Sequence, residues 1–85
     1  MDSYTEAEML TEEEAQILGL ERQWWKYAGA KDQAISEQLS MSAVSYYRTL
    51  NRLIDTEDAL AYDPILVKRL RRQRDARHRE RSARR

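Results

Sequence analysis

The stretch ISEQLSMSAVSYYRTL, residues 35–50, decides the fold of this 85-residue chain. It begins within a short amphipathic segment, which predicts a helix from about Lys31 to Leu39. It then passes through a Ser-Met-Ser break at 40–42 and continues as a longer segment with one apolar side. Apolar residues recur at the helical spacing of three or four, and Ser42 is a favourable N-cap for the second segment. Two helices joined by a three-residue turn in this way are typical of a helix-turn-helix.

The apolar positions of the bacterial helix-turn-helix pattern are filled without a gap, by Ile35, Leu39, Met41, Tyr46 and Leu50. Two positions depart from the pattern. Ser36 stands where alanine is usual, and Ser40 stands where the turn has glycine. A serine at that turn must adopt a positive φ, which is uncommon for a residue with a side chain, or the turn must differ slightly.

On the N-terminal side, Thr11 and Glu14 have the spacing of a capping box and predict a helix that starts there. The apolar residues of this helix recur on one face at Ile17, Leu20, Trp24 and Ala28. Gly29 is expected to end the helix, because glycine takes the left-handed C-terminal conformation at little cost. Residues 1–10 are polar and acidic, and we expect a flexible N-terminus.

On the C-terminal side, the helix from Ser42 is expected to reach about residue 55, and Thr56 to cap a short helix through Tyr62. Asp63 and Pro64 predict the N-cap and first residue of a fifth helix. Residues expected to pack from it onto the body are Ile65, Leu66, Val67 and Leu70. Beyond residue 70 no large apolar side chain remains, so residues 71–85 are expected to be a projecting helix or a disordered arm.

These patterns predict an all-α fold, a helix-turn-helix bundle of four to five helices with an extended basic C-terminal helix or arm. The expected organisation is a flexible acidic segment 1–10, a helix-turn-helix domain 11–70 and an arginine-rich arm 71–85. A tight polar turn and a clean apolar stripe on each helix suit a bundle with one small core.

The formal net charge of zero hides a strong asymmetry along the chain. Residues 1–63 hold five Lys/Arg against thirteen Asp/Glu, whereas residues 64–85 hold ten Lys/Arg against two Asp/Glu. Arginine pairs with phosphate through a planar fork, so this segment predicts salt-dependent binding to a polyanion. The polyanion could also be RNA. The alternative to nucleic-acid binding is that the basic segment is a solvated tail or pairs with the acidic N-terminus. A membrane surface is disfavoured because the arm lacks an apolar stripe.

The composition argues against catalysis and metal binding. The chain has no cysteine, which excludes disulfides and thiolate metal sites and favours the cytoplasm, in association with the nucleoid. The one histidine, His78, stands among arginines, and no glycine-rich loop or Ser/His/Asp set is present. We therefore expect a protein that is not an enzyme, holds no cofactor or metal, and does not span a membrane.

The exposed side of the helix from Ser42 carries the candidate base-reading groups. Arg48 is expected to bond the O6 and N7 of guanine, and Ala43 and Val44 to touch a thymine methyl group. Arg52 is expected to contact the DNA phosphate backbone. The alternative for Arg48 and Arg52 is that they only form a solvated face of the helix. The candidate DNA-binding residues are Ser42, Ala43, Val44, Ser45, Tyr47, Arg48, Thr49 and Arg52 from this helix, with Lys68, Arg69, Arg71, Arg72, Arg74 and Arg77 from the arm.

Two aromatic pairs have ambiguous positions. Tyr46 is assigned to the core, while Tyr47 either caps the core edge or reaches a phosphate through its hydroxyl. Trp24 and Trp25 are both expected to pack in the core; the alternative is that one of them stays partly exposed as a contact for a partner protein.

The stretches ERQWWKYAGAKDQAI (21–35), YYRTLNRLID (46–55) and DPILVKRLRR (63–72) resemble a family of short actinobacterial and actinophage proteins known only as a domain of unknown function. The resemblance covers about residues 11–75. It implies a helix-turn-helix fold and DNA binding, with no assigned reaction or cofactor. A weaker likeness is to the promoter-binding region of sigma factors.

The sequence thus predicts a sequence-specific DNA-binding protein that regulates transcription, with double-stranded DNA as its partner and a homodimer as one arrangement. The alternative is an adaptor that binds RNA polymerase or another regulator through the Trp-bearing helix or the acidic N-terminus.

Overall fold

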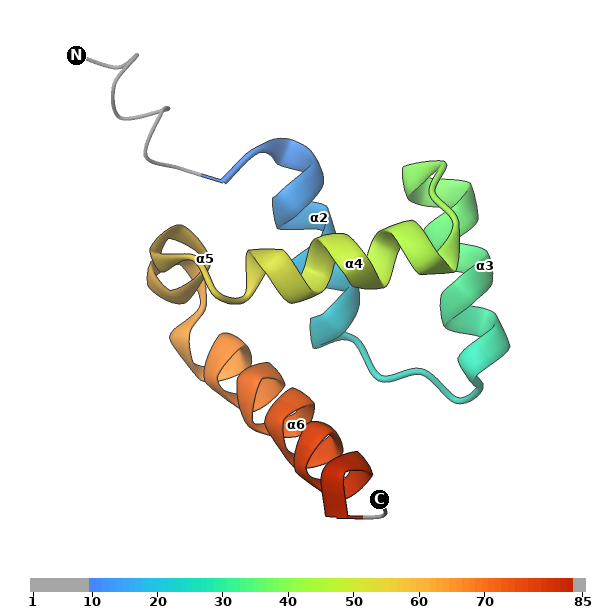
Figure 1. Ribbon diagram of the computed structural model, residues 1–85. Helices are drawn as coiled ribbons and strands as arrows, with labels where there is room; N and C mark the ends of the chain where they lie inside the picture. The colour runs from blue at the N-terminus through green and yellow to red at the C-terminus, as the bar shows by residue number, and fades with distance from the viewer. Residues whose placement is uncertain (1–9, 84–85) are drawn as a thin grey trace, which may run out of the picture.

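The computed structural model describes residues 10–83, which form five α-helices and no strand within that range (Figure 1). The helices are α2 (Glu12–Arg22), α3 (Ala28–Leu39), α4 (Ala43–Leu53), α5 (Glu57–Tyr62) and α6 (Pro64–Ala83). This confirms the predicted all-α helix-turn-helix bundle with an extended basic C-terminal helix. The flexible N-terminus predicted for residues 1–10 lies, apart from Leu10, outside the described residues.

The helices α2, α3 and α4 pack around one core, and α5 and α6 close it at the C-terminal end of α4. In Figure 1, α4 lies across the front of the molecule with α2 behind it, and α6 runs away from α5 below α4. The largest fully buried side chains come from α2, α3, α4, α6 and the residue that follows α4: Ile17, Leu18, Ile35, Tyr46, Ile54 and Val67. The assignment of Tyr46 to the core is confirmed.

The helix starts predicted at Thr11, Ser42, Thr56 and Asp63 are confirmed by their capping hydrogen bonds. Thr11 and Glu14 form the reciprocal capping box of α2. Ser42 accepts from the Ser45 N–H at the start of α4, and Thr56 accepts from the Ala59 N–H at the start of α5. Asp63 accepts from the N–H of Leu66, so it caps α6, of which Pro64 is the first residue. Each cap satisfies a backbone donor that the helix itself leaves without a partner.

The predicted end of the first helix is wrong. The helix α2 ends at Arg22, and Gly29 lies inside α3, which begins three residues before the predicted Lys31. The indole N–H of Trp25 donates to the carbonyl oxygen of Leu20 at 2.9 Å, so this side chain folds back on the last turn of α2. The chain therefore leaves the helix at residue 23, and the side chain of Trp24 is 82% exposed instead of lying in the core.

The turn between α3 and α4 adopts the conformation that its sequence requires. Ser40 has φ 55° and ψ 39°, the only positive φ of a non-glycine residue in the described chain. Its N–H donates to the carbonyl oxygen of Ser36 at 3.0 Å and closes the end of α3. The left-handed serine turns the chain sharply, so that Ser42 can start α4 two residues later.

The buried apolar side chains of α6 come from its first two turns. Leu66, Val67 and Leu70 are buried, as predicted, but Ile65 is 82% exposed. Ile65 precedes Leu66 by one position, and neighbouring helical positions differ by about 100° in direction. The expectation that Ile65 packs on the body is therefore wrong. Among the described residues, no helix combines the length and apolar character needed to cross a membrane.

Candidate nucleic-acid interface

The helix α4 presents a continuous exposed face opposite its buried stripe. Tyr46, Leu50 and Leu53 are buried on the inner side. The predicted contact residues fall on or beside the outer side: Ser42, Val44, Ser45, Tyr47, Arg48 and Arg52 are exposed, whereas Ala43 and Thr49 are half-buried. The guanidinium of Arg48 makes no hydrogen bond or ion pair with another residue in the described chain, so it is available to a ligand.

Asn51 also lies on this exposed face and is absent from the predicted set. It follows Arg48 by three positions, which places it about 60° around the helix. The signal was present in the sequence, because a polar residue at this spacing continues the row of Val44 and Arg48. An amide side chain can both donate and accept hydrogen bonds, which suits a base edge or a phosphate.

A polar cluster inside the bundle fixes α4 against α2. The hydroxyl of Tyr46 donates to Glu21 Oε2 at 2.6 Å and lies 3.2 Å from the carbonyl oxygen of Ile17. The side chain of Glu21 is only 7% exposed. Burial, with the hydrogen bond to this carboxylate, raises the pKa of Tyr46, so the phenol keeps its proton across the physiological range.

Lys31 brings α3 into the same cluster. Its Nζ lies 2.7 Å from Glu21 Oε2, and it stands over the rings of Tyr46 and Tyr47 at 5.7 and 5.0 Å. Burial acts to lower the pKa of Lys31, but the contacts with Glu21 and Tyr47 outweigh it and raise that pKa. Tyr47 packs edge-on against Tyr46, with ring centroids 4.9 Å apart. It therefore caps the core edge, one of the two roles expected for it.

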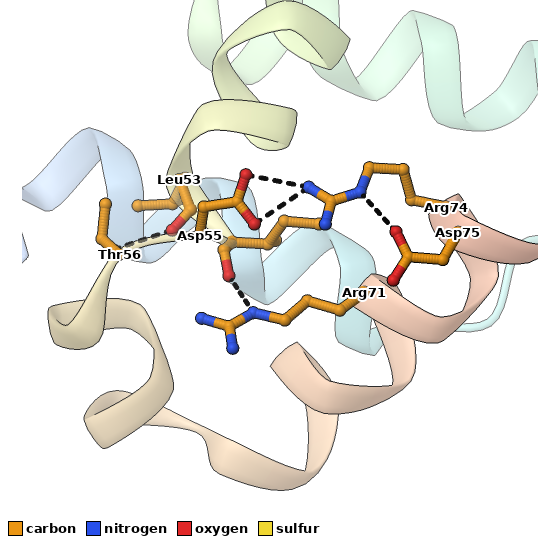
Figure 2. A network of polar contacts seen from close by, with 7 residues as sticks. Leu53, Asp55, Thr56, Arg71, Arg74 and Asp75 are labelled. Atoms are coloured by element: carbon orange, nitrogen blue, oxygen red, sulfur yellow. Dashed lines mark hydrogen bonds and ion pairs between the residues drawn. The ribbon is translucent and has the colours of Figure 1, made fainter. Parts of the chain in front are cut away.

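The predicted arm residues separate into two groups, and the first is bound to the body of the protein. As Figure 2 shows, Arg71 Nε donates to the carbonyl oxygen of Ile54, and Arg74 Nη1 lies 3.0 Å from both carboxylate oxygens of Asp55. The hydrogen bond with Asp55 raises the pKa of Arg74, which also contacts Asp75 at 3.2 Å. Ile54 and Asp55 follow the last residue of α4, where the helix dipole favours cations. Arg71 and Arg74 therefore fix α6 to the C-terminal end of α4.

Arg69 belongs in part to the same group, because its Nη2 donates to the carbonyl oxygen of Glu21 at 3.4 Å. A tertiary contact of this kind leaves no mark in the sequence, where Arg69, Arg71 and Arg74 look like the other arginines of the arm. We conclude that these three side chains hold α6 in place, which the composition alone did not indicate.

The second group extends into solvent. Lys68, Arg72 and Arg77, with the further residues Arg79 and Arg81, are exposed. They make no ion pair or hydrogen bond with any other residue in the range 10–83. The predicted boundary between domain and arm at residue 70 falls within α6, which continues through it as one helix. The unpaired cations are therefore carried on a helix that is attached to the core.

The cations of α6, paired and unpaired, lie on two sides of the helix. Arg74, Arg77 and Arg81 continue the spacing of the buried Leu70 and form an inner row, on the side that faces α4. Lys68, Arg72 and Arg79 form an outer row on the opposite side. A cleft of about 420 Å³ lies between α4 and α6, with Tyr47 and Asn51 on one wall and Arg74 and Arg77 on the other. The exposed face of α4 and the inner row of α6 thus border the same hollow.

Trp24, one of the two candidate partner contacts, is exposed, whereas Trp25 is half-buried and bonded to the end of α2. In the described part of the chain, no three His, Cys, Asp or Glu side chains are grouped so as to hold a metal ion. His78 is exposed on α6.

A comparison with protein families matches residues 9–82 to the family described as "Protein of unknown function (DUF3263)". The expectation of a family of unknown function is thereby confirmed. No curated protein matches the chain, and no solved structure matches it.

Proposed function

The chain belongs to the DUF3263 family, and we propose that it is a helix-turn-helix protein that binds double-stranded DNA and regulates transcription in actinobacteria or their phages. The proposal includes a cytoplasmic, nucleoid-associated location and no catalytic role. The observation that carries it is the exposed face of α4 with the unpaired Arg48, next to a helix that carries further unpaired arginines.

In the proposed complex, α4 enters the major groove with its N-terminal half nearest the bases. Val44 is 67% exposed at this end, where an apolar group can contact a thymine methyl. Arg48 follows one turn later, and its fork can bond the O6 and N7 of a guanine. Arg52 lies another turn along, where the groove wall brings a phosphate close.

The proposed source of non-specific affinity is α6. Each phosphate that a cation neutralises releases counterions, so binding weakens steeply as salt rises. Since Arg71 and Arg74 are engaged with the end of α4, the unpaired side chains should carry most of this contribution. The acids in the first turns of α2 and α5 would favour an orientation that turns them away from the DNA.

The test begins with selection of bound duplexes from a random library, followed by fluorescence anisotropy on the selected duplex. Arg48→Ala should weaken binding to that duplex by roughly ten-fold or more and change the base preferred at one or two positions. Lys26→Ala, which removes an exposed cation from the loop between α2 and α3, is the control and should keep the same preference. No duplex binding by the wild type at low salt, or an unchanged preference in Arg48→Ala, would refute the proposal.

One observation favours a second candidate, an adaptor that binds RNA polymerase or another regulator. Trp24 is 82% exposed, and exposed tryptophan is a frequent anchor of protein interfaces. If this candidate is correct, Trp24→Ser should abolish binding to purified RNA polymerase while leaving the circular dichroism spectrum and any DNA affinity unchanged. A polymerase affinity equal to that of the wild type would exclude it.

A further inference from the structure

We propose that the cleft between α4 and α6 binds one backbone phosphodiester of the DNA duplex that α4 reads, with Arg77 as its cationic ligand and Asn51 and Gln73 as neutral ones. This inference rests on the proposed function and assigns a site within it. Apolar and polar side chains both line the cleft; most come from α4 and α6, and Glu21 of α2 and Lys31 of α3 also contribute to the lining.

The charges around the cleft leave one cation without a protein partner. Lys31 is paired with Glu21 at 2.7 Å, and Arg74 is paired with Asp55 at 3.0 Å. Arg77 lines the cleft and is exposed, and no acidic group in residues 10–83 forms an ion pair with it. The cleft therefore presents one uncompensated positive charge.

The neutral groups on the walls complete the ligand set. Asn51 from α4 and Gln73 from α6 both line the cleft, and each amide can donate two hydrogen bonds. One cation with neutral donors matches the single negative charge of a phosphodiester. A dianionic phosphate monoester would call for further unpaired cations, since buried charge is stable only when it is compensated.

The position of the cleft connects it to the DNA-reading face. Asn51 lies on that face and also on the wall of the cleft, about 60° around α4 from Arg48. A helix seated in the major groove has a phosphate backbone on each side of it. The strand on the α6 side of α4 would pass over the cleft, within reach of Arg77. The outer row of α6 points away from this strand.

The test uses two substitutions with the same charge change. Arg77→Gln removes the cation of the cleft. Arg79→Gln removes a cation two positions along the same helix, about 160° away on the outer row. Both residues are exposed, and neither has a contact whose loss would destabilise the fold. Dissociation constants are measured by anisotropy on the selected duplex between 50 and 200 mM salt.

We expect Arg77→Gln to weaken binding about ten-fold at low salt and to reduce the slope of log affinity against log salt by about 1, as loss of one phosphate contact does. Arg79→Gln should change the slope by less than half as much. Asn51→Ala and Gln73→Ala should weaken binding without a change in slope, because neither removes a charge. Equal effects of Arg77→Gln and Arg79→Gln would overturn the assignment of the cleft.

The failures of the two proposals are distinguishable. If the wild type binds no duplex, the proposed function fails, whereas duplex binding that depends on Arg48 but not on Arg77 refutes only the cleft. A further experiment is a titration of the protein with inorganic phosphate and with adenosine monophosphate. Binding is followed by NMR, from the side-chain amide and guanidinium signals. Binding of either at micromolar concentration, lost in Arg77→Gln, would show a free-anion site and overturn the assignment to the DNA backbone.

Discussion

The phenol oxygen of Tyr46, in the helix proposed to read DNA, lies 2.6 Å from the carboxylate of Glu21 in the first described helix. These residues are 25 positions apart, and their contact joins α4 to α2 through the core. Lys31 of α3 binds the same carboxylate oxygen. The mutual orientation of the three helices therefore depends on polar contacts as well as on apolar packing.

Tyr46→Phe should lower the free energy of unfolding by about 1–3 kcal/mol, because it removes a hydrogen bond to a nearly buried charged group. The measurement is a urea titration followed by circular dichroism. Tyr27→Phe is the control, since Tyr27 is 64% exposed and its hydroxyl has no hydrogen bond within the described residues. A stability loss in the control as large as that in Tyr46→Phe would contradict the structural role of the contact.

Lys31→Met should lower the free energy of unfolding by about 1–3 kcal/mol, since Glu21 loses its cation. The double variant Glu21→Gln/Lys31→Met should lose less than the sum of the two single variants, because no unpaired charge remains. The raised pKa of Lys31 adds a pH dependence. The unfolded state releases its proton first, so this stabilisation is complete below the ordinary pKa of 10.5 and is lost as pH rises through the folded value.

In alkaline urea titrations the wild type should accordingly lose stability above about pH 10, where the raised pKa of Tyr46 acts in the same direction. Lys31→Met should show a shallower loss. Lys26→Met, at an exposed position, should reproduce the wild-type curve, and a steeper curve in Lys31→Met than in the wild type would exclude this explanation.

Ser40→Gly and Ser36→Gly should change stability in opposite directions, although both make the same chemical change. Ser40 has φ 55°, a conformation that glycine adopts without strain, so its replacement should stabilise the fold by up to about 1 kcal/mol. Ser36 is exposed within α3, where glycine should destabilise by about 0.5 kcal/mol. Thermal unfolding of the two variants checks this; a Ser40→Gly variant that loses as much stability as Ser36→Gly would be inconsistent with the left-handed turn.

Asp63→Asn should reduce the sensitivity of the fold to acid. The hydrogen bond from Arg22, at 2.7 Å, together with that from the Leu66 N–H, lowers the pKa of Asp63. The stabilisation from this carboxylate is therefore present above its ordinary pKa of 3.8 and is lost as pH falls through the lower folded value. Asparagine keeps the helix cap but loses the charge.

The comparison for Asp63→Asn is made by urea titration between pH 2 and 6. The stability of the variant should vary less with pH than that of the wild type below about pH 4. Asp32→Asn changes an exposed acid that has no hydrogen bond or ion pair with another side chain in the described range, and it should keep the wild-type pH dependence. If both variants behave alike, the pairing of Asp63 with Arg22 has no part in acid stability.

Single-tryptophan variants should separate the two neighbouring indoles. Trp25→Phe should lower the free energy of unfolding by about 1 kcal/mol, because the indole N–H loses its bond to Leu20, whereas Trp24→Phe should have no effect. Iodide should quench the fluorescence of Trp24 more strongly than that of Trp25. Equal quenching of the two would disagree with their different burial.

The helix starts could be predicted from sequence because a cap is a local interaction. Thr11, Ser42, Thr56 and Asp63 each bond to a backbone N–H three residues away, so spacing alone identifies them. The register of the turn identified Ser40 as the position that takes a positive φ unless the turn differs, and the structure has the first of these two alternatives. These local signals placed α4 and its exposed face correctly.

What could not be predicted depends on contacts between distant segments. Trp24 and Ala28 continue the helical spacing of α2, but the side chain of Trp25 bonds back to the last turn of that helix, a contact that the periodicity does not reveal. Likewise, Arg74 and Arg77 look equivalent in sequence, and only the fold pairs one of them with Asp55. Asn51 is a different case, because its spacing from Val44 and Arg48 is visible in the sequence and needs no distant contact.

Because α6 runs as one helix from the buried Leu66 to Ala83, its unpaired cations stand at fixed positions before any ligand arrives. A flexible basic tail would have to lose backbone freedom on binding, at about 1–2 kcal/mol for each residue that becomes ordered. In this protein the backbone is already ordered when the chain folds. Two glycines introduced at Ala76 and Ser82 would loosen the helix, so that part of the ordering cost would fall on DNA binding, and the same arginines would then bind phosphate less tightly.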